Sequence, residues 1–172
     1  MAIMEAIATQ YLEADAASVT FSSIPATYEH LQVLGSNRAA GASTGQAYYI
    51  ELNGDSSSVY ASQVIRSHTS TSGANALNST AYIQIFDGIH GSSTDASEYA
   101  TIKVDILDYA NANKNTSVLL NGGQSISNSN KRLFFGGGVW DDTAALTQIK
   151  FTPSNGNMRR GSSFTLYGIK SS

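Results

Sequence analysis

The fold is decided by the C-terminal run Leu146-Thr147-Gln148-Ile149-Lys150-Phe151 and by the run that follows it, Gly161-Ser162-Ser163-Phe164-Thr165-Leu166-Tyr167-Gly168-Ile169. Both runs alternate apolar and polar residues, a pattern that predicts half-buried β-strands. Phe164 and Leu166 share one face of the second strand. Because the opposite face, which includes Tyr167, is apolar too, we expect this strand to lie inside a sandwich or against another subunit.

A turn is predicted between these two strands, at Ser154-Asn155-Gly156-Asn157. Asn and Gly tolerate positive φ, and Asn also bonds its own backbone. The two strands should therefore form the last hairpin of the chain, with Arg159 and Arg160 in its loop. Arginines at a hairpin tip are well placed to meet carboxylates on another surface.

Similar runs, bounded by Gly, Asn, Asp or Pro, predict strands along most of the remaining chain. They cover residues 7–12, 18–21, 28–34, 47–52, 59–65, 82–86, 99–107, 116–120 and 131–140. Asn53-Gly54 is a favoured tight turn and suggests a hairpin between the strands that flank it. Residues 68–79 show no period and are predicted to be a long polar loop.

This pattern, with about ten short strands and no amphipathic stretch of helical length, predicts an all-β protein. We expect an antiparallel β-sandwich, jelly-roll-like, that forms a single domain over residues 1–172. The order of the strands cannot be derived from the sequence, because it depends on pairings between distant segments.

The composition excludes several classes of protein. Hydrophobic residues are 41% of the chain and the net charge is −3, which argues against disorder and against binding nucleic acid through phosphates. The chain has no cysteine, so disulfides and thiolate metal sites are excluded. No apolar run approaches the roughly 20 residues of a membrane span, and residues 1–10 lack the pattern of a signal peptide.

No group of residues predicts catalysis or a metal site. Gly41-Ala42-Ser43-Thr44-Gly45 matches the nucleophile motif G-x-S-x-G, but a strand rather than a helix should follow it. His30, His68 and His90 are far apart in the sequence. Turn and capping roles suit the aspartates better than a calcium site does: Asp105, Asp108, Asp141 and Asp142. We therefore expect a protein that is not an enzyme and needs no cofactor or metal.

Three parts of the chain resemble small virion structural proteins of tailed phages, including cyanophages. They are the opening, Ile7-Ala8-Thr9-Gln10 with Ala17-Ser18-Val19-Thr20-Phe21-Ser22-Ser23-Ile24-Pro25-Ala26-Thr27-Tyr28, the middle, Ile106-Leu107-Asp108-Tyr109-Ala110-Asn111, and the ending, Gly161-Ser162-Ser163-Phe164-Thr165-Leu166-Tyr167-Gly168-Ile169-Lys170. The resemblance implies a β-sandwich on the virion, either a capsid decoration (cement) protein or a tail or fibre component. It implies no catalytic residues.

Our first hypothesis is a decoration protein, expected as a homotrimer, that binds the major capsid protein on the outer shell and stabilises contacts between its subunits. Low charge and apolar residues on both faces of strands support a role in binding other subunits. The candidates for docking polar capsid loops are Arg159, Arg160, Lys131 and Arg132. The candidates for packing between subunits are Trp140 and Tyr167.

The alternative is a receptor- or carbohydrate-binding module on the phage tail. Exposed Tyr or Trp side chains would stack on sugars, with polar residues of loops such as 67–79 around them. An enzyme that acts on cell-wall or capsule sugars is the weakest hypothesis, because no carboxylate pair stands out in the sequence.

Overall fold

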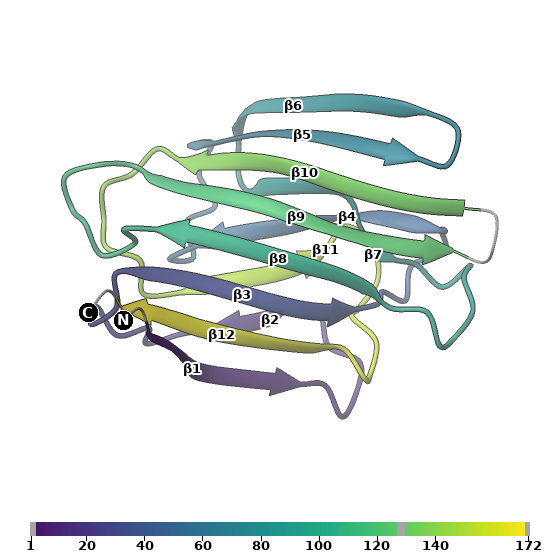
Figure 1. Cartoon of the computed structure of the whole chain (residues 1–172), viewed down its shortest axis with the longest axis horizontal. Coiled ribbons are helices and arrows are strands. Elements are labelled where there is room, and N and C mark those ends of the chain that lie inside the picture. Colours follow the sequence, from purple (N-terminus) through teal and green to yellow (C-terminus); the bar gives the residue numbers. More distant parts are fainter. Residues whose placement is uncertain (1–2, 127–129, 171–172) are drawn as a thin grey trace.

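Two antiparallel sheets, of eight and four strands, make up the computed structural model of the chain (Figure 1). The structure describes residues 3–126 and 130–170. In this part of the chain all the regular elements are strands, which confirms the predicted all-β antiparallel sandwich. They are β1 (Ile3–Tyr11), β2 (Val19–Phe21), β3 (His30–Asn37), β4 (Gly45–Leu52), β5 (Tyr60–His68), β6 (Ser72–Thr80), β7 (Ile83–His90), β8 (Ala100–Leu107), β9 (Thr116–Ile126), β10 (Asn130–Trp140), β11 (Ile149–Pro153) and β12 (Ser163–Lys170). Nowhere in the described residues is there a helix with the length and apolar character needed to cross a membrane.

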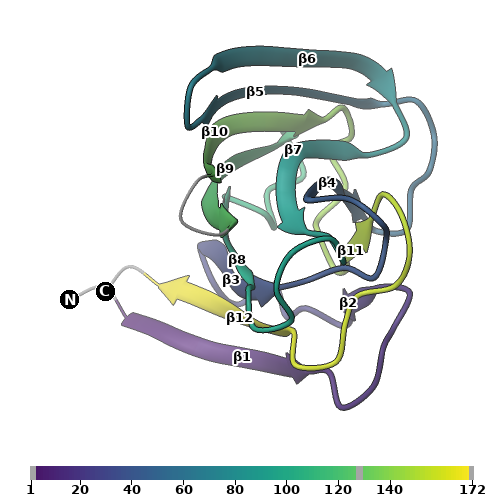
Figure 2. The ribbon, with the colours of Figure 1, turned by 90° about the vertical axis from the view of Figure 1, so that its right-hand side faces the viewer.

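The strand order is that of a jelly roll with two added hairpins. The large sheet runs β1-β12-β3-β8-β9-β10-β5-β6, and the small sheet runs β2-β11-β4-β7. If the hairpins β5–β6 and β9–β10 are set aside, the chain changes sheet after every strand except β4, whose successor β7 lies beside it. Such changes of sheet build a jelly roll. Figure 2 shows β1 and β12 at one end of the large sheet and the β5–β6 hairpin at the other.

Both predicted hairpins around the small sheet are wrong, because these connections change sheet. β4 and β5 flank Asn53-Gly54, yet β4 pairs with β11 and β7, whereas β5 pairs with β10 and β6. Likewise β11 pairs with β2 and β4, and β12 pairs with β1 and β3. Arg159 and Arg160 therefore lie in a connection between the two sheets rather than in a hairpin loop.

The predicted loop at 68–79 is also wrong, because most of it forms β6. This strand pairs with β5 from Ser67↔Ser72 to Ser62↔Leu77 and ends the large sheet. Its small and polar residues have weak strand propensity. The edge of β5 supplies the backbone hydrogen bonds that the sequence pattern did not reveal.

The two C-terminal strands supply the centre of the core, one from each sheet. Phe151 of β11 and Phe164 of β12 are fully buried, and their rings stack with centroids 5.5 Å apart. Tyr48 of β4 stacks on Phe164 at 6.2 Å. Phe164 and Leu166 share one face of β12, as predicted, and this face lies against the core, whereas Thr165 and Tyr167 face outward.

Candidate interaction surface

A group of apolar side chains is exposed on the outer face of the large sheet. In β10, Phe134 faces the core while Phe135 and Leu133 face solvent, with 55% and 66% of their surface exposed. Ile65 of β5 lies directly opposite Phe135 in the register. We call this group the Phe135 patch; its members are Ile65, Leu119, Leu133, Phe135 and Val139.

Glycines leave the surface around Phe135 hollow. Gly137 stands between Phe135 and Val139 on the outer side of β10, opposite Leu119 of β9. A hollow of about 650 Å³ opens there, lined also by Gln63. A second hollow, of about 930 Å³, opens on the other side of Phe135, beside Leu133. The patch is therefore uneven and can accept protruding side chains.

The face around the patch is almost without charge. Alternate residues of β5 and β9 point outward on this face. They are Ala61, Gln63, Ile65 and Ser67 in β5, and Ser117, Leu119, Asn121, Gly123 and Ser125 in β9. Among the described outward positions of β5, β6, β9 and β10, only Lys131 is charged, near the start of β10. On the neighbouring strand β8 the outer face does carry charged residues: Lys103 and Asp105 form an ion pair of 3.0 Å. Depletion of charge is typical of the centre of a protein interface.

Trp140 does not lie at the surface, which corrects its predicted role in packing between subunits. Its side chain is 2% exposed, and its ring stacks on Tyr60. The indole Nε1–H donates a hydrogen bond of 2.9 Å to Asp55. Hydrogen bonds from Ser57 and Trp140 lower the pKa of Asp55. Trp140 faces the core because it shares its side of β10 with Phe134.

Arg132 is also turned inward, which corrects its predicted role in docking. Only 11% of its side chain is exposed, and its guanidinium contacts Asp87 at 2.7 Å. Arg66 and His68 contact the same carboxylate at 2.5 and 2.9 Å. Because Asp87 belongs to β7, whereas Arg66 and His68 belong to β5 and Arg132 belongs to β10, this cluster joins the two sheets.

The other predicted site residues remain accessible but do not form one site. Lys131 is exposed at the edge of the hollow beside Leu133. Arg160 is exposed, and Arg159 forms an ion pair of 3.0 Å with Asp15. Tyr167 is half-buried on the outer face of β12, paired with Gln32 of β3 and distant from the Phe135 patch.

Several polar side chains are buried at the end of the sandwich where the Asp87 cluster lies. The register places Arg132 beside Gln124, on the core side of β10 and β9. Gln124, Asn37 and His90 are buried, and their side-chain nitrogen and oxygen atoms have no hydrogen-bond partner among the described residues. Burial lowers the pKa of His90, as do Arg38 and Arg132, whereas Glu98 opposes the shift. His90 is therefore held in its neutral form.

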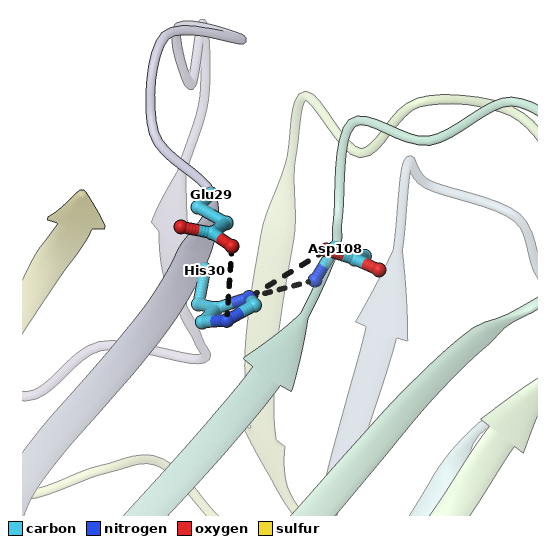
Figure 3. A group of neighbouring side chains, drawn as sticks. All are labelled: Glu29, His30 and Asp108. Carbon is cyan, nitrogen blue, oxygen red and sulfur yellow. Dashed lines mark hydrogen bonds and ion pairs between the residues drawn. The ribbon is translucent and has the colours of Figure 1, made fainter. Parts of the chain in front are cut away.

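Glu29, His30 and Asp108 gather where β3 begins and β8 ends (Figure 3). The backbone N–H of Asp108 donates a hydrogen bond of 3.1 Å to His30 Nδ1. The neutral ring then carries its proton on Nε2, which faces Glu29 at 3.9 Å. In this arrangement the lone pair of the imidazole is directed at the backbone of Asp108.

The remaining polar motifs have structural roles. The Ser43 hydroxyl donates to the backbone oxygen of Gly45, and strand β4 follows, so the G-x-S-x-G match lacks the strand-to-helix turn of a nucleophile. Asp142 accepts a hydrogen bond from the backbone N–H of Ala144, and Asp108 pairs with Lys114. The contact of Asp142 agrees with the predicted turn role, whereas Asp105 lies within β8 and pairs with Lys103, so the turn prediction is wrong for Asp105.

The sequence analysis did not identify the Phe135 patch, although a signal was present. Leu133, Phe134 and Phe135 are three consecutive apolar residues in a predicted strand. Successive residues of a strand point to opposite faces, so such a run must place an apolar side chain on each face. Which face is covered depends on the second sheet, and the sequence does not specify that.

Comparisons with known proteins add little. No family model and no curated protein matches the chain. Among solved structures, the chain is similar to the alginate lyase vAL-1 from Chlorella virus, with 10% identity, a TM-score of 0.34, and coverage of 95% of this chain and 83% of that one. It is also similar to scytalido-glutamic peptidase, with 12% identity, a TM-score of 0.27, and coverage of 90% and 65%. At these TM-scores neither likeness carries an argument.

Proposed function

We propose that this chain is a virion structural protein of a tailed phage, a decoration protein that binds the outer shell and stabilises contacts between major capsid subunits. The observation that carries the proposal is the Phe135 patch, an exposed and almost uncharged apolar surface on a β-sandwich. The resemblance of the opening, middle and ending segments to phage virion proteins supports the choice of partner.

The size of the patch suits a lasting protein contact. Burying a Leu, Ile or Phe side chain completely stabilises by about 1.5–3 kcal/mol. The five patch residues are each 38–66% exposed, so covering them yields on the order of 4–8 kcal/mol. Association costs an estimated 4–15 kcal/mol. The patch therefore offsets only the lower half of this range, and polar contacts around it must supply the rest of the cost and the net affinity.

Cationic residues beyond the patch can supply such contacts. Lys131 lies at the edge of the hollow beside Leu133, which Tyr99 also lines. Tyr99 lines a further hollow of about 430 Å³ as well, together with Arg159 and Arg160. Lys131, Arg159 and Arg160 are therefore candidates for binding acidic or polar loops of the shell.

Binding of purified variants to phage shells that lack the chain tests the proposal. Leu133→Gln and Phe135→Gln should each weaken co-sedimentation with shells at least tenfold, because they replace apolar contacts at the centre of the interface. Leu107→Gln is the matched control: Leu107 is 54% exposed on the same face of the sheet but lies outside the patch. Unchanged binding of the patch variants, or an equal loss in the control, would overturn the proposal.

A carbohydrate-binding role on the tail is a second candidate, and the hollow surface beside Phe135 favours it. Gln63 lines one hollow and Asn121 the other, so an aromatic ring lies among amides. Sugar sites combine an aromatic platform with amide hydrogen bonds. Binding in a glycan array that Phe135→Gln abolishes, without binding to shells, would favour this function over decoration.

A further inference from the structure

Strand β6 forms an edge of the large sheet without charge or proline, and its register with β5 shifts only near its end, between Leu77 and Thr80. An edge strand presents unpaired backbone N–H and C=O groups, and proteins normally protect such edges with charge, proline, bulges or short length. Residues 69–86, which contain β6, include no Asp, Glu, Lys, Arg or Pro. From Ser72 to Leu77 the strand keeps an unbroken register with β5.

The other three edge strands of the described sheets are all protected. β1 carries Glu5 and shifts register between Ala6 and Ala8. β2 has only three residues. β7 carries Asp87, and its pairing with β4 shifts register near Gln46. Among these edges, β6 alone combines an unbroken register from Ser72 to Leu77 with the absence of charge and proline.

We propose that β6 pairs antiparallel with β6 of a second copy, about a two-fold axis through Asn75. This pairing places Ala74 opposite Ala76 on the outer face, where small side chains meet without strain. It places Gly73 opposite Leu77 on the other face. A Cβ added to Gly73 would have nothing within 4 Å, so the space there admits the partner's leucine. The strand is thus complementary to itself in shape and contains no like charges to repel.

The pairing would join the two large sheets into one. Ala74 of β6 lies opposite Ile65 of β5, so the outer faces would continue from one Phe135 patch to the other. A two-fold contact uses the same surface on both subunits and closes as a dimer. The homotrimer expected under the decoration hypothesis needs a different, head-to-tail contact. The inference stands on the edge itself and does not rest on the proposed function.

The mass of the purified full chain in solution, by light scattering, tests the pairing first. The expected result is twice the 18.2 kDa of one chain. The double variant Ala74→Lys/Ala76→Lys places lysines opposite lysines and should weaken dimerisation at least tenfold. Ala6→Lys on β1 is the matched control, since Ala6 is also exposed on an edge strand, and it should remain dimeric.

A single introduced cysteine tests the register. The chain has no cysteine of its own, and directly opposed residues in antiparallel strands lie about 4.5–5.5 Å apart at Cα, within reach of a disulfide. Asn75→Cys should cross-link the dimer on mild oxidation, and Ala6→Cys should not. A mass of one or three chains, or a dimer that survives the double lysine variant, would overturn the proposal. When the Asn75→Cys variant is mixed with phage shells, a cross-link to a shell protein instead of a second copy would also overturn the proposal. The partner of β6 would then be a strand of the shell.

Discussion

Individual glycines let strands approach one another closely in this sandwich. A Cβ added to Gly136 would lie 2.3 Å from the backbone oxygen of Gln63 and 2.8 Å from the Cα of Val64. Backbone atoms in a sheet cannot move away cheaply. The register of β10 with both neighbours is unbroken, so these glycines allow a close approach between strands and do not form a bulge.

Gly136→Ala should lower the free energy of unfolding by about 1–3 kcal/mol, the usual cost of overpacking. Gly73→Ala is the control, because its Cβ would meet nothing within 4 Å. It should change stability by less than about 1 kcal/mol. Denaturant unfolding at low protein concentration measures both. If the two variants changed the free energy of unfolding equally, the close approach of β5 to Gly136 would not be what excludes a side chain there.

His90 should make stability depend on pH. Its pKa in the folded protein lies below the ordinary value of 6.5, mainly because of burial. Below about pH 6.5 the unfolded chain therefore binds more protons at this site, and stability falls as pH falls towards the folded pKa. Each unit of pKa difference corresponds to about 1.4 kcal/mol.

The matched variant is His90→Gln, which keeps a polar side chain but does not titrate. Between about pH 7 and pH 5, the parent protein should lose more unfolding free energy than the variant. The carboxylates titrate in both proteins, so the difference isolates the imidazole. Parallel pH profiles would mean that His90 is protonated in the folded state as readily as in the unfolded chain.

At the scale of elements, the connection between β4 and β5 shows how the chain leaves one sheet for the other. Asn53 has a φ of 52°, and Gly54 has a φ of 69°. The Asn53 side-chain oxygen accepts hydrogen bonds from the backbone of Thr147 and Gln148, and its amide donates to Ala145. One asparagine therefore holds this connection against the segment that leads into β11.

Asn53→Ala should destabilise by roughly 2–4 kcal/mol, because it removes these hydrogen bonds and because alanine, unlike asparagine, has no side-chain hydrogen bond that favours positive φ. Asn53→Asp should cost less, since a carboxylate still accepts from Thr147 and Gln148. Asn53→Gly removes only the hydrogen bonds and should fall between the two. If thermal or denaturant unfolding ranked Asp as the worst of the three, the contacts of the side chain would not explain its role.

Local sequence patterns predicted single elements better than connections. Alternation identified β12 and showed that Phe164 and Leu166 share one face of it, and Asn53-Gly54 was correctly expected to be a turn. The patterns failed where the structure of a segment depends on its pairing with a strand that is distant in the sequence. β6 has little strand propensity of its own and forms on the edge of β5, while the predicted hairpins gave way to changes of sheet.

At the scale of the whole molecule, the fold class followed from many short alternating runs, but the surface did not. The same alternation that placed Phe134 and Trp140 in the core placed Phe135 and Leu133 outside. Two predicted site residues, Trp140 and Arg132, proved to face inward because of their parity along β10. Parity separates two faces of a strand, but only the position of the second sheet decides which face is covered.

The measurement that most directly tests the decoration role is a cryo-EM map of phage particles that contain this chain. We predict density for the β-sandwich repeated over the icosahedral shell, with the outer face of the large sheet and its Phe135 patch turned towards the major capsid protein. Density confined to the tail would contradict the decoration role. Density on the shell with the small sheet facing the capsid would contradict the role of the Phe135 patch.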